Sequence, residues 1–342
     1  MAVKAYAAYT AKGKLERYEY EAGPLSAADV EIRVTHCGIC HSDISMIDGS
    51  GSSQYPLVPG HEVIGIITAV GANVGDIRQV GQRVGVGWQA GSCGTCEWCA
   101  RGKENLCPTG RPTIIGRPGG WASSVRCQAE FAVPIPDALS SENAGPLMCA
   151  GVTVFTPMVE YGVMPWMRTA VVGIGGLGHL AVEFLAKFGC EVTAISSSRD
   201  KEADARTLGA ARFIATKGTD ELARAAGTFD FIVSTVSADI PWGDYLAALR
   251  PQGRLVIVGL PETDIRFPVV PLLLERSVSG GAAGSPSDIA RMLEFAARAG
   301  IVARVEQFPM ADVNRAVDHV RSGKARFRAV LVSDPAAAGA AG

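Results

Sequence analysis

The sequence has no apolar run of the roughly 18 residues that a membrane-spanning helix requires, and residues 1–23 contain no hydrophobic signal region. Its charges nearly balance, with 32 Lys and Arg against 34 Asp and Glu, so it offers no broad basic field for nucleic acid or an anionic membrane. We therefore expect a cytoplasmic protein that acts on a small molecule and binds neither nucleic acid nor a membrane.

The chain is longer than one typical domain: its 342 residues suggest two domains of about 150 residues each. Nine cysteines are an odd number for a disulfide framework. The cytosol would keep them reduced and available for metal binding. This composition favours an intracellular metalloprotein.

Four cysteines lie within fifteen residues, in the pattern Cys93-x2-Cys96-x2-Cys99-x7-Cys107. Four thiolates at such spacing can close a tetrahedron around Zn2+, which leaves no metal position for chemistry. The pattern predicts a structural zinc site in an irregular loop. Two disulfides are the alternative.

A second, dispersed set combines Cys40, His61 and Cys149. Two cysteines and one histidine would leave the fourth position of zinc open to water or substrate. Each residue could equally be an ordinary buried side chain.

The periodicity of apolar residues changes at Met167. Before it, short alternating stretches such as Val30–Val34, Gly65–Gly71 and Arg83–Gly87 predict an antiparallel, barrel-like β domain. After it, strands alternate with helices, which is typical of a parallel sheet covered on both faces. The predicted strands are Ala170–Val172, Val192–Ile195, Arg212–Ile214, Phe229–Val233 and Arg254–Val258, and the predicted helices are His179–Phe188, Trp242–Leu249 and Asp288–Ala299. The run Ala336–Gly342 lacks the apolar content to fold, so we expect a disordered tail.

The turn Gly173-Ile174-Gly175-Gly176-Leu177-Gly178 fits G-x-G-x-x-G between a predicted strand and a predicted helix. Such a turn places a pyrophosphate at the helix N-terminus, so we assign Gly173, Gly175, Gly176, Leu177 and Gly178 to a dinucleotide. A purely structural turn is the alternative. Four residues at or just after the ends of later strands, Thr235, Val236, Val258 and Gly259, complete the expected contacts.

The second predicted strand of this unit ends without the acid that binds the ribose of NAD. It ends in Ser196, Ser197, Ser198, Arg199 and, after Asp200, Lys201. Three hydroxyls and two cations would receive a 2′-phosphate, so the run predicts NADP rather than NAD. The serines could instead cap the following helix.

Taken together, these motifs resemble the zinc-dependent medium-chain alcohol dehydrogenases, in the branch of cinnamyl alcohol dehydrogenases and bacterial NADPH aldehyde reductases. The resemblance runs from about Cys37 to Arg328. It implies an α/β fold with a GroES-like β-barrel catalytic domain at 1–149 and 285–342, which holds both zinc sites, and a Rossmann doubly wound parallel-sheet NADP-binding domain at 150–284. The implied activity is reversible hydride transfer between NADP(H) and an aldehyde or primary alcohol, with two zinc ions per chain. Zinc would polarise the carbonyl oxygen, and the nicotinamide would carry the hydride.

The resemblance also implies roles for single residues around the open zinc site. Glu62 would lie beside the metal or ligate it transiently, and Asp43 would orient the ring of His61. Ser42 would pass a proton to or from the substrate oxygen, while His41 and Arg328 would meet the cofactor pyrophosphate. An ordinary charged residue on a turn is the alternative for Glu62.

The chain departs from the family pattern at Ser45, where many relatives carry a histidine that completes a proton relay. Water or the cofactor ribose would then deliver the proton directly, or the enzyme would release protons slowly. We expect Cys37 not to bind metal, because this branch carries both cysteines and uses only the second. Outside the motifs, we expect His36, His179 and His319 to be structural or surface residues, and Cys127 and Cys190 to be small apolar residues.

The substrate region combines one large and two small side chains. Trp88 matches a position that lines the substrate channel, and Ala282 and Ala283 stand where cinnamyl enzymes carry bulky residues, which predicts an aromatic or bulky apolar substrate. The resemblance further implies a homodimer through an edge strand at Val278–Gly281, supported by the apolar run Pro271–Leu274, which could also be internal core.

Two other functions remain open. One is an NAD-dependent secondary alcohol or polyol dehydrogenase, which the Ser196–Lys201 run disfavours. The other is a non-catalytic zinc- and nucleotide-binding sensor, and Ser45 is the only residue that supports it.

Overall fold

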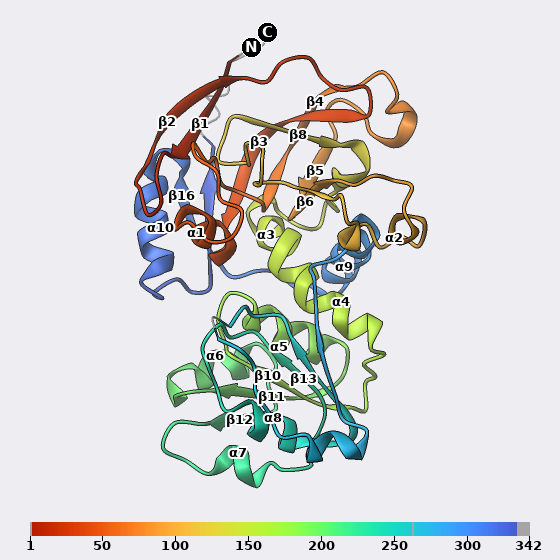
Figure 1. The fold of residues 1–342 in the computed structure, drawn as a ribbon, viewed down its shortest axis with the longest axis vertical. Helices are drawn as coiled ribbons and strands as arrows, with labels where there is room; N and C mark the ends of the chain where they lie inside the picture. The colour runs from red at the N-terminus through yellow and green to blue at the C-terminus, as the bar shows by residue number, and fades with distance from the viewer. Residues whose placement is uncertain (1, 262, 334–342) are drawn as a thin grey trace. The chain divides into compact units, whose positions relative to one another are not determined.

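The computed structural model describes residues 2–261 and 263–333, so the predicted tail at Ala336–Gly342 lies outside the described residues. The chain forms two compact units (Figure 1). The first contains the chain up to Val152 and again from Gly284 onward, and the second contains Thr153–Ala283. The first unit is therefore built from both ends of the sequence.

The first unit is organised around a seven-stranded sheet. Its strand order is β16 (Val305–Pro309), β17 (Arg328–Val332), β3 (Asp29–Ile39), β4 (Val63–Val70), β5 (Arg83–Val86) and β9 (Val133–Pro134), and β8 (Ser124–Gln128) also pairs with β3. Separate hairpins join β1 (Ala2–Ala8) to β2 (Leu15–Glu21) and β6 (Gln89–Gly91) to β7 (Arg111–Pro112). Except for β16 with β17, the pairs are antiparallel, which confirms the antiparallel β domain predicted before Met167.

Helices of this unit connect or cover the strands. They are α1 (His41–Ile47), α2 (Glu97–Ala100), α3 (Ser141–Pro146), α9 (Pro286–Ala299) and α10 (Val313–Arg321). The prediction of an irregular loop across the cysteine cluster was wrong in part, because α2 and a 3-10 turn at Glu104–Leu106 lie within it. The N–H of Ala100 donates to the carbonyl of Cys96 at 2.9 Å, so closely spaced cysteines are compatible with one helical turn.

The second unit contains a six-stranded parallel sheet. Its order is β12 (Arg212–Ala215), β11 (Glu191–Ser196), β10 (Arg168–Val172), β13 (Phe229–Ser234), β14 (Leu249–Ile257) and β15 (Ser277–Gly280). The order reverses beside β10, as in a doubly wound fold. Helices α4 (Val152–Glu160), α5 (Gly178–Lys187), α6 (Glu202–Thr207), α7 (Glu221–Arg224) and α8 (Trp242–Ala248) accompany the sheet. The predicted α/β class is confirmed.

Burial explains why the strands of this sheet read as continuous apolar runs. Four of the five residues of β10 are buried, and β13 is buried at every position except Asp230. A parallel sheet that is covered on both faces has no solvent side on which to place polar residues. The central strands were therefore visible in the sequence without alternation.

Element boundaries differ from the predictions by a few residues. Helix α9 begins at Pro286 rather than Asp288, because Ser285 caps it: the Asp288 N–H donates to Ser285 Oγ at 3.2 Å, and the Ser285 N–H donates to the Asp288 carboxylate at 3.0 Å. Strand β14 begins at Leu249 rather than Arg254. Within 2–261 and 263–333, no helix combines the length and the apolar character that crossing a bilayer demands.

Candidate metal centres and dinucleotide turn

The four clustered cysteines bring their sulfurs together without bonding to one another. The Sγ atoms of Cys93, Cys96, Cys99 and Cys107 all lie within 4.8 Å of one another, and all four cysteines are free. Cys96 and Cys99 are 3.5 Å apart at sulfur, Cys93 and Cys107 are 3.6 Å apart, and Cys93 and Cys99 are 3.9 Å apart. A tetrahedron with Zn–S bonds of about 2.3 Å has edges of about 3.8 Å, so this site fits a four-coordinate zinc ion.

Backbone N–H groups favour the thiolate form in this loop. The Cys96 N–H donates to Cys93 Sγ at 3.3 Å, and the Cys93 N–H donates to Cys107 Sγ at 3.5 Å. Hydrogen bonds from the backbone of Thr95 and Cys96 lower the pKa of Cys93 to about 5. Backbone hydrogen bonds also lower the pKa of Cys107, whereas the backbone hydrogen bond from Cys99 is outweighed by burial and the side chains of Cys99 and Cys93, which raise the pKa of Cys96 to about 11. Thiolates such as Cys93 are ready to bind a metal ion, which would displace the proton of Cys96.

The dispersed set is brought together as closely as the cluster. Ligand atoms of Cys40, His61, Glu62 and Cys149 lie within 4.8 Å of one another, with His61 Nε2 3.2 Å from Cys149 Sγ. His61 and Glu62 are fully buried, and Cys40 is 5% exposed. Two sulfurs and one imidazole fit zinc with an open position, and a fourth, carboxylate ligand lies within reach.

Each of these side chains stands at the end of an element. Cys40 follows β3 and precedes α1, His61 and Glu62 precede β4, and Cys149 lies in a π-helical turn at Leu147–Gly151. The pairing of β3 with β4 therefore brings the first three together. A π-helical turn is often found at functional sites.

The side chains of Cys40 and Cys149 are close enough to shift each other's pKa in opposite directions. A hydrogen bond from the Cys149 thiol lowers the pKa of Cys40 well below its usual value, and the same bond raises the pKa of Cys149. A divalent cation would displace that proton and hold both groups as thiolates.

Asp43 organises the backbone and the imidazole around this site. Its carboxylate accepts hydrogen bonds from the N–H groups of Cys40 and Gly60, at 3.0 and 2.8 Å, and lies 2.8 Å from His61 Nδ1. Burial lowers the pKa of His61, but the Asp43 carboxylate and the Cys40 side chain together outweigh burial and raise it overall. With Nδ1 directed at Asp43, Nε2 remains the ligand atom.

Glu62 and Arg328 form a buried ion pair that we did not predict from the sequence. Arg328 Nη2 donates to Glu62 Oε1 and, at 3.1 Å, to the carbonyl of Ile39, and Arg328 is only 3% exposed. Burial raises the pKa of Glu62 to about 7, although Arg328 lowers it. Glu62 Oε2 is buried without a hydrogen-bond partner among the described residues. An unpartnered carboxylate oxygen at this place is consistent with a nearby cation.

The remaining predicted residues of this unit lie around the open site. Ser42 Oγ is 3.8 Å from Cys40 Sγ, and the Trp88 ring meets the His61 ring edge-on at 5.0 Å between centroids. His41 and Ser45 are exposed on α1. The Cys37 thiol instead faces the carbonyl of Gly38 at 3.7 Å and is not among the grouped ligands.

The glycine-rich turn follows β10 directly and leads into α5. Gly173 has a φ of +86°, and a side chain on Gly178 would overlap the carbonyl oxygen of Gly173. Thr235 Oγ1 donates to the carbonyls of Val172 and Gly173, at 3.0 and 2.9 Å. A side chain on Gly173 would strike Val236, as would one on Gly259. The structure therefore gathers the predicted cofactor residues Gly173, Gly178, Thr235, Val236 and Gly259 around one turn, and Val258 precedes Gly259.

The serine run lies where predicted, but Arg199 is already engaged. Ser196 ends β11, and Ser198 Oγ donates to Asp200 at 3.0 Å. Arg199 pairs with Glu202 at 2.8 Å and also with Glu221. We did not predict either pair from the sequence. Glu202 is three residues away along the chain, whereas only the fold brings Glu221 near Arg199. A contact between Arg199 and a 2′-phosphate would therefore compete with its pairs to Glu202 and Glu221.

The small residues of the predicted substrate region follow β15. Ala282 is exposed, and Ala283 has a φ of +49°. Both belong to the second unit, whereas Trp88 belongs to the first.

Comparison with known proteins matches two family descriptions to separate parts of the chain. Residues 26–137 match "Alcohol dehydrogenase GroES-like domain", and residues 176–298 match "Zinc-binding dehydrogenase". An aldehyde reductase from Synechocystis, AdhA, is 47% identical over 331 residues, which cover 96% of this chain and 98% of that protein.

Solved structures show the same fold. A cinnamyl alcohol dehydrogenase from Sorghum bicolor has a TM-score of 0.92 and 39% identity, covering 97% of this chain and 98% of that chain. A cinnamyl alcohol dehydrogenase from Helicobacter pylori, complexed with NADP(H), has a TM-score of 0.88 and 27% identity, with coverage of 97% and 98%. The chain therefore belongs to the zinc-dependent alcohol dehydrogenases, with a GroES-like domain and a Rossmann-type domain, in the group that includes cinnamyl alcohol dehydrogenases and aldehyde reductases.

Proposed function

We propose that this protein is an NADPH-preferring zinc enzyme that reversibly reduces an aldehyde to a primary alcohol. The observation that carries the proposal is the grouping of Cys40, His61 and Cys149 around one point, in a chain that also carries a complete glycine-rich turn. An open zinc site polarises a carbonyl oxygen, and a reduced nicotinamide supplies the hydride. Neither group alone suffices for the reaction.

The residues around the site have distinct tasks. Cys40, His61 and Cys149 bind the catalytic metal, Asp43 holds the imidazole in one orientation, and Ser42 moves the proton to or from the substrate oxygen. Glu62 is held by Arg328 beside the metal ligands. Cys93, Cys96, Cys99 and Cys107 bind the second, structural zinc ion.

The cofactor preference rests on the end of β11. Ser196, Ser197, Ser198 and Lys201 offer donors, and the strand end itself carries no carboxylate that would repel a 2′-phosphate. The Asp200 carboxylate just beyond it accepts a hydrogen bond from Ser198, and Arg199 is shared with Glu202 and Glu221. The NADP(H) bound by the Helicobacter pylori relative supports the same choice. Ser197→Asp should lower kcat/KM for NADPH roughly tenfold or more and spare NADH, because charge repulsion is added at the phosphate.

The substrate proposed is an aromatic or bulky apolar aldehyde. In the first unit, Trp88 beside His61 would provide an aromatic wall. The expected room rests on the sequence alone, in which Ala282 and Ala283 stand in place of bulky residues. His41 and Arg328 are proposed to meet the pyrophosphate, although Arg328 also pairs with Glu62.

The experiment that tests the function is an initial-rate assay of nicotinamide oxidation with NADPH and NADH. The panel runs from short aliphatic to aromatic aldehydes and includes a ketone, with mannitol and NAD for the reverse direction. Fast oxidation of NADPH by aromatic aldehydes, lost after zinc chelation, is the expected result. Turnover with NAD and mannitol alone would support a polyol dehydrogenase. No turnover in protein with two zinc ions would support a sensor.

We also propose a homodimer that resides in the cytoplasm. Strand β15 is an edge of the parallel sheet, and Leu260, Val270 and Leu273 nearby are 74%, 67% and 76% exposed. Two sets of thiolate ligands require a reducing compartment. Light scattering of wild type and Leu273→Glu tests the assembly; a wild-type monomer would contradict it.

A further inference from the structure

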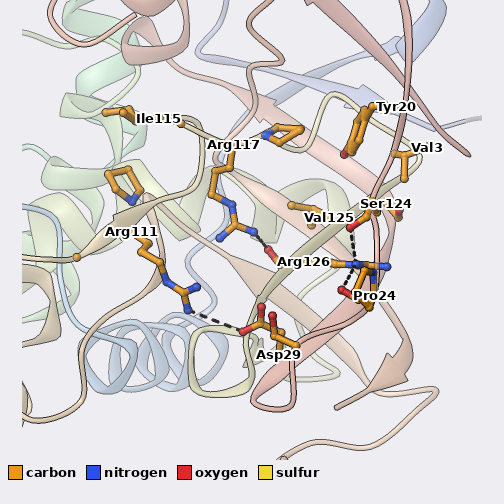
Figure 2. Close-up of a pocket in the computed structure, with 16 residues that line it drawn as sticks. Val3, Tyr20, Pro24, Asp29, Arg111, Ile115, Arg117, Ser124, Val125 and Arg126 are labelled. Carbon is orange, nitrogen blue, oxygen red and sulfur yellow. Dashed lines mark hydrogen bonds and ion pairs between the residues drawn. The ribbon is translucent and has the colours of Figure 1, made fainter. Parts of the chain in front are cut away.

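A pocket opens in the first unit, formed by residues that the proposed catalytic chemistry does not use. It has a volume of about 500 Å3, within the usual range of small-ligand sites. Its walls come from β2, β8 and the segment that follows the cysteine cluster, residues 110–118. Figure 2 shows Arg111, Arg117 and Arg126 in this pocket.

Two of these three guanidinium groups have carboxylate partners. Arg126 pairs with Glu31 at 2.7 Å and donates to the carbonyls of Ala22, Gly23 and Pro24. Arg111 lies 3.8 Å from Asp29. Three cations thus share the carboxylates of Glu31 and Asp29, which leaves this group with an excess of one positive charge.

Arg117 is the one of the three that has no carboxylate in direct contact, although the Asp29 carboxylate acts on it from farther away. Among the described residues it forms no ion pair, and its hydrogen-bond acceptor is the main-chain carbonyl of Arg126 (Figure 2). Burial lowers the pKa of Arg117, so its charge is poorly solvated. A guanidinium carries five N–H donors in a planar fork. One carbonyl acceptor uses only part of this donor capacity, so Arg117 can bind a further acceptor.

Besides these arginines and Asp29, the lining is mainly apolar, with hydroxyl groups from Tyr20, Ser26 and Ser124. Val3, Pro112, Ile115 and Val125 contribute carbon surface. An apolar wall beside one half-buried cation suits a ligand with an apolar body and a single anionic head.

We propose that this pocket is a binding site for a small organic monoanion, an apolar carboxylate whose head pairs with Arg117. The carboxylate accepts two hydrogen bonds from the guanidinium fork, and its apolar part lies against Ile115 and Val125. The site is separate from the ligands grouped around Cys40 and His61 and does not depend on the proposed reaction.

The test is calorimetric titration of benzoate, benzamide and inorganic phosphate into the zinc-loaded enzyme. Arg117→Gln is compared with Arg78→Gln, a matched control: Arg78 is also half-buried, donates to main-chain carbonyls and lies outside the pocket lining. We expect benzoate to bind wild type and Arg78→Gln equally, and Arg117→Gln at least tenfold more weakly. Benzamide and phosphate should each bind more weakly than benzoate, since one lacks charge and the other lacks an apolar body.

Equal benzoate affinity in wild type and Arg117→Gln would overturn the proposal, because any benzoate bound would then lie elsewhere, for instance on the catalytic metal. If phosphate bound as tightly as benzoate, the proposed contact between an apolar ligand body and the pocket wall would be wrong. A second measurement needs no variant: benzoate should protect Arg117, but not Arg78, from phenylglyoxal, as read by mass spectrometry. Unchanged modification of Arg117 would also contradict the proposal.

Discussion

His61 Nδ1 lies 2.8 Å from Asp43 Oδ1, and both side chains are fully buried. This contact orients the ring so that Nε2 faces the thiols of Cys40 and Cys149. Asp43→Asn should therefore weaken zinc binding at this site by about 10–100-fold, because the amide both loses charge and presents a donor to neighbouring N–H groups. Competitive chelation measures the affinity. Asp48→Asn at the end of the same helix is the control, and equal losses in the two variants would contradict the role of Asp43.

The buried Glu62–Arg328 pair predicts that the protein is strongly destabilised when Arg328 is replaced. Arg328→Met should lower the free energy of unfolding by about 3–5 kcal/mol, because it leaves a buried carboxylate without its partner. Arg321→Met removes a partly exposed pair with Asp48 and should cost about 0–1 kcal/mol. Chemical denaturation compares the two. If both variants lost the same free energy of unfolding, burial of the Glu62–Arg328 pair would not affect stability.

Removal of one cysteine from the cluster should remove one metal ion. Cys99→Ser should retain one zinc ion per chain instead of two and unfold at lower temperature, since three ligands hold the structural ion poorly. Cys127→Ser changes a buried cysteine that belongs to neither ligand group and should keep both ions. Metal analysis by mass spectrometry gives the counts; two ions in Cys99→Ser would refute the assignment.

Two glycines of the turn separate folding from cofactor binding. Gly178→Ala should destabilise the second unit and abolish cofactor binding, because its Cβ would overlap the main chain of Gly173. Around Gly175 an added Cβ meets no protein atom within 4 Å. Gly175→Ala should therefore keep its melting temperature yet bind NADPH more weakly, as the methyl group obstructs the pyrophosphate. Unchanged NADPH affinity in Gly175→Ala would count against a cofactor at this turn.

The imidazole of His36 should titrate below its ordinary range. Burial lowers its pKa from 6.5, and the Glu142 carboxylate partly opposes this effect. The folded state thus prefers neutral His36, and this contribution to stability is present above pH 6.5 and is lost as pH falls through the lowered pKa. Glu142→Gln should lower the pKa further. Proton NMR of the imidazole follows the titration, and a rise in the variant would contradict the stated cause.

Much of the architecture was predictable because local patterns carried it. The strands from Ala170 to Val258 were visible as apolar runs, since both faces of a parallel sheet are buried. The ends of elements were less predictable: the start of α9 depends on the capping bond between Ser285 and Asp288. Arg328 was assigned to the cofactor alone, because nothing in the sequence around it indicates Glu62.

The sequence by itself determined which residues can carry chemistry: the cysteine spacing, the glycine-rich turn and the serine run each need only neighbours along the chain. The tertiary structure decided which distant groups meet. Pairing of β17 with β3 brings Arg328 to Glu62, and the fold engages Arg199 with Glu221. Within the part of the chain that the structure describes, no carboxylate forms an ion pair with Arg117. Electrostatic interactions depend on the distance between charges in three dimensions, and local sequence patterns do not give that distance for residues far apart in the chain.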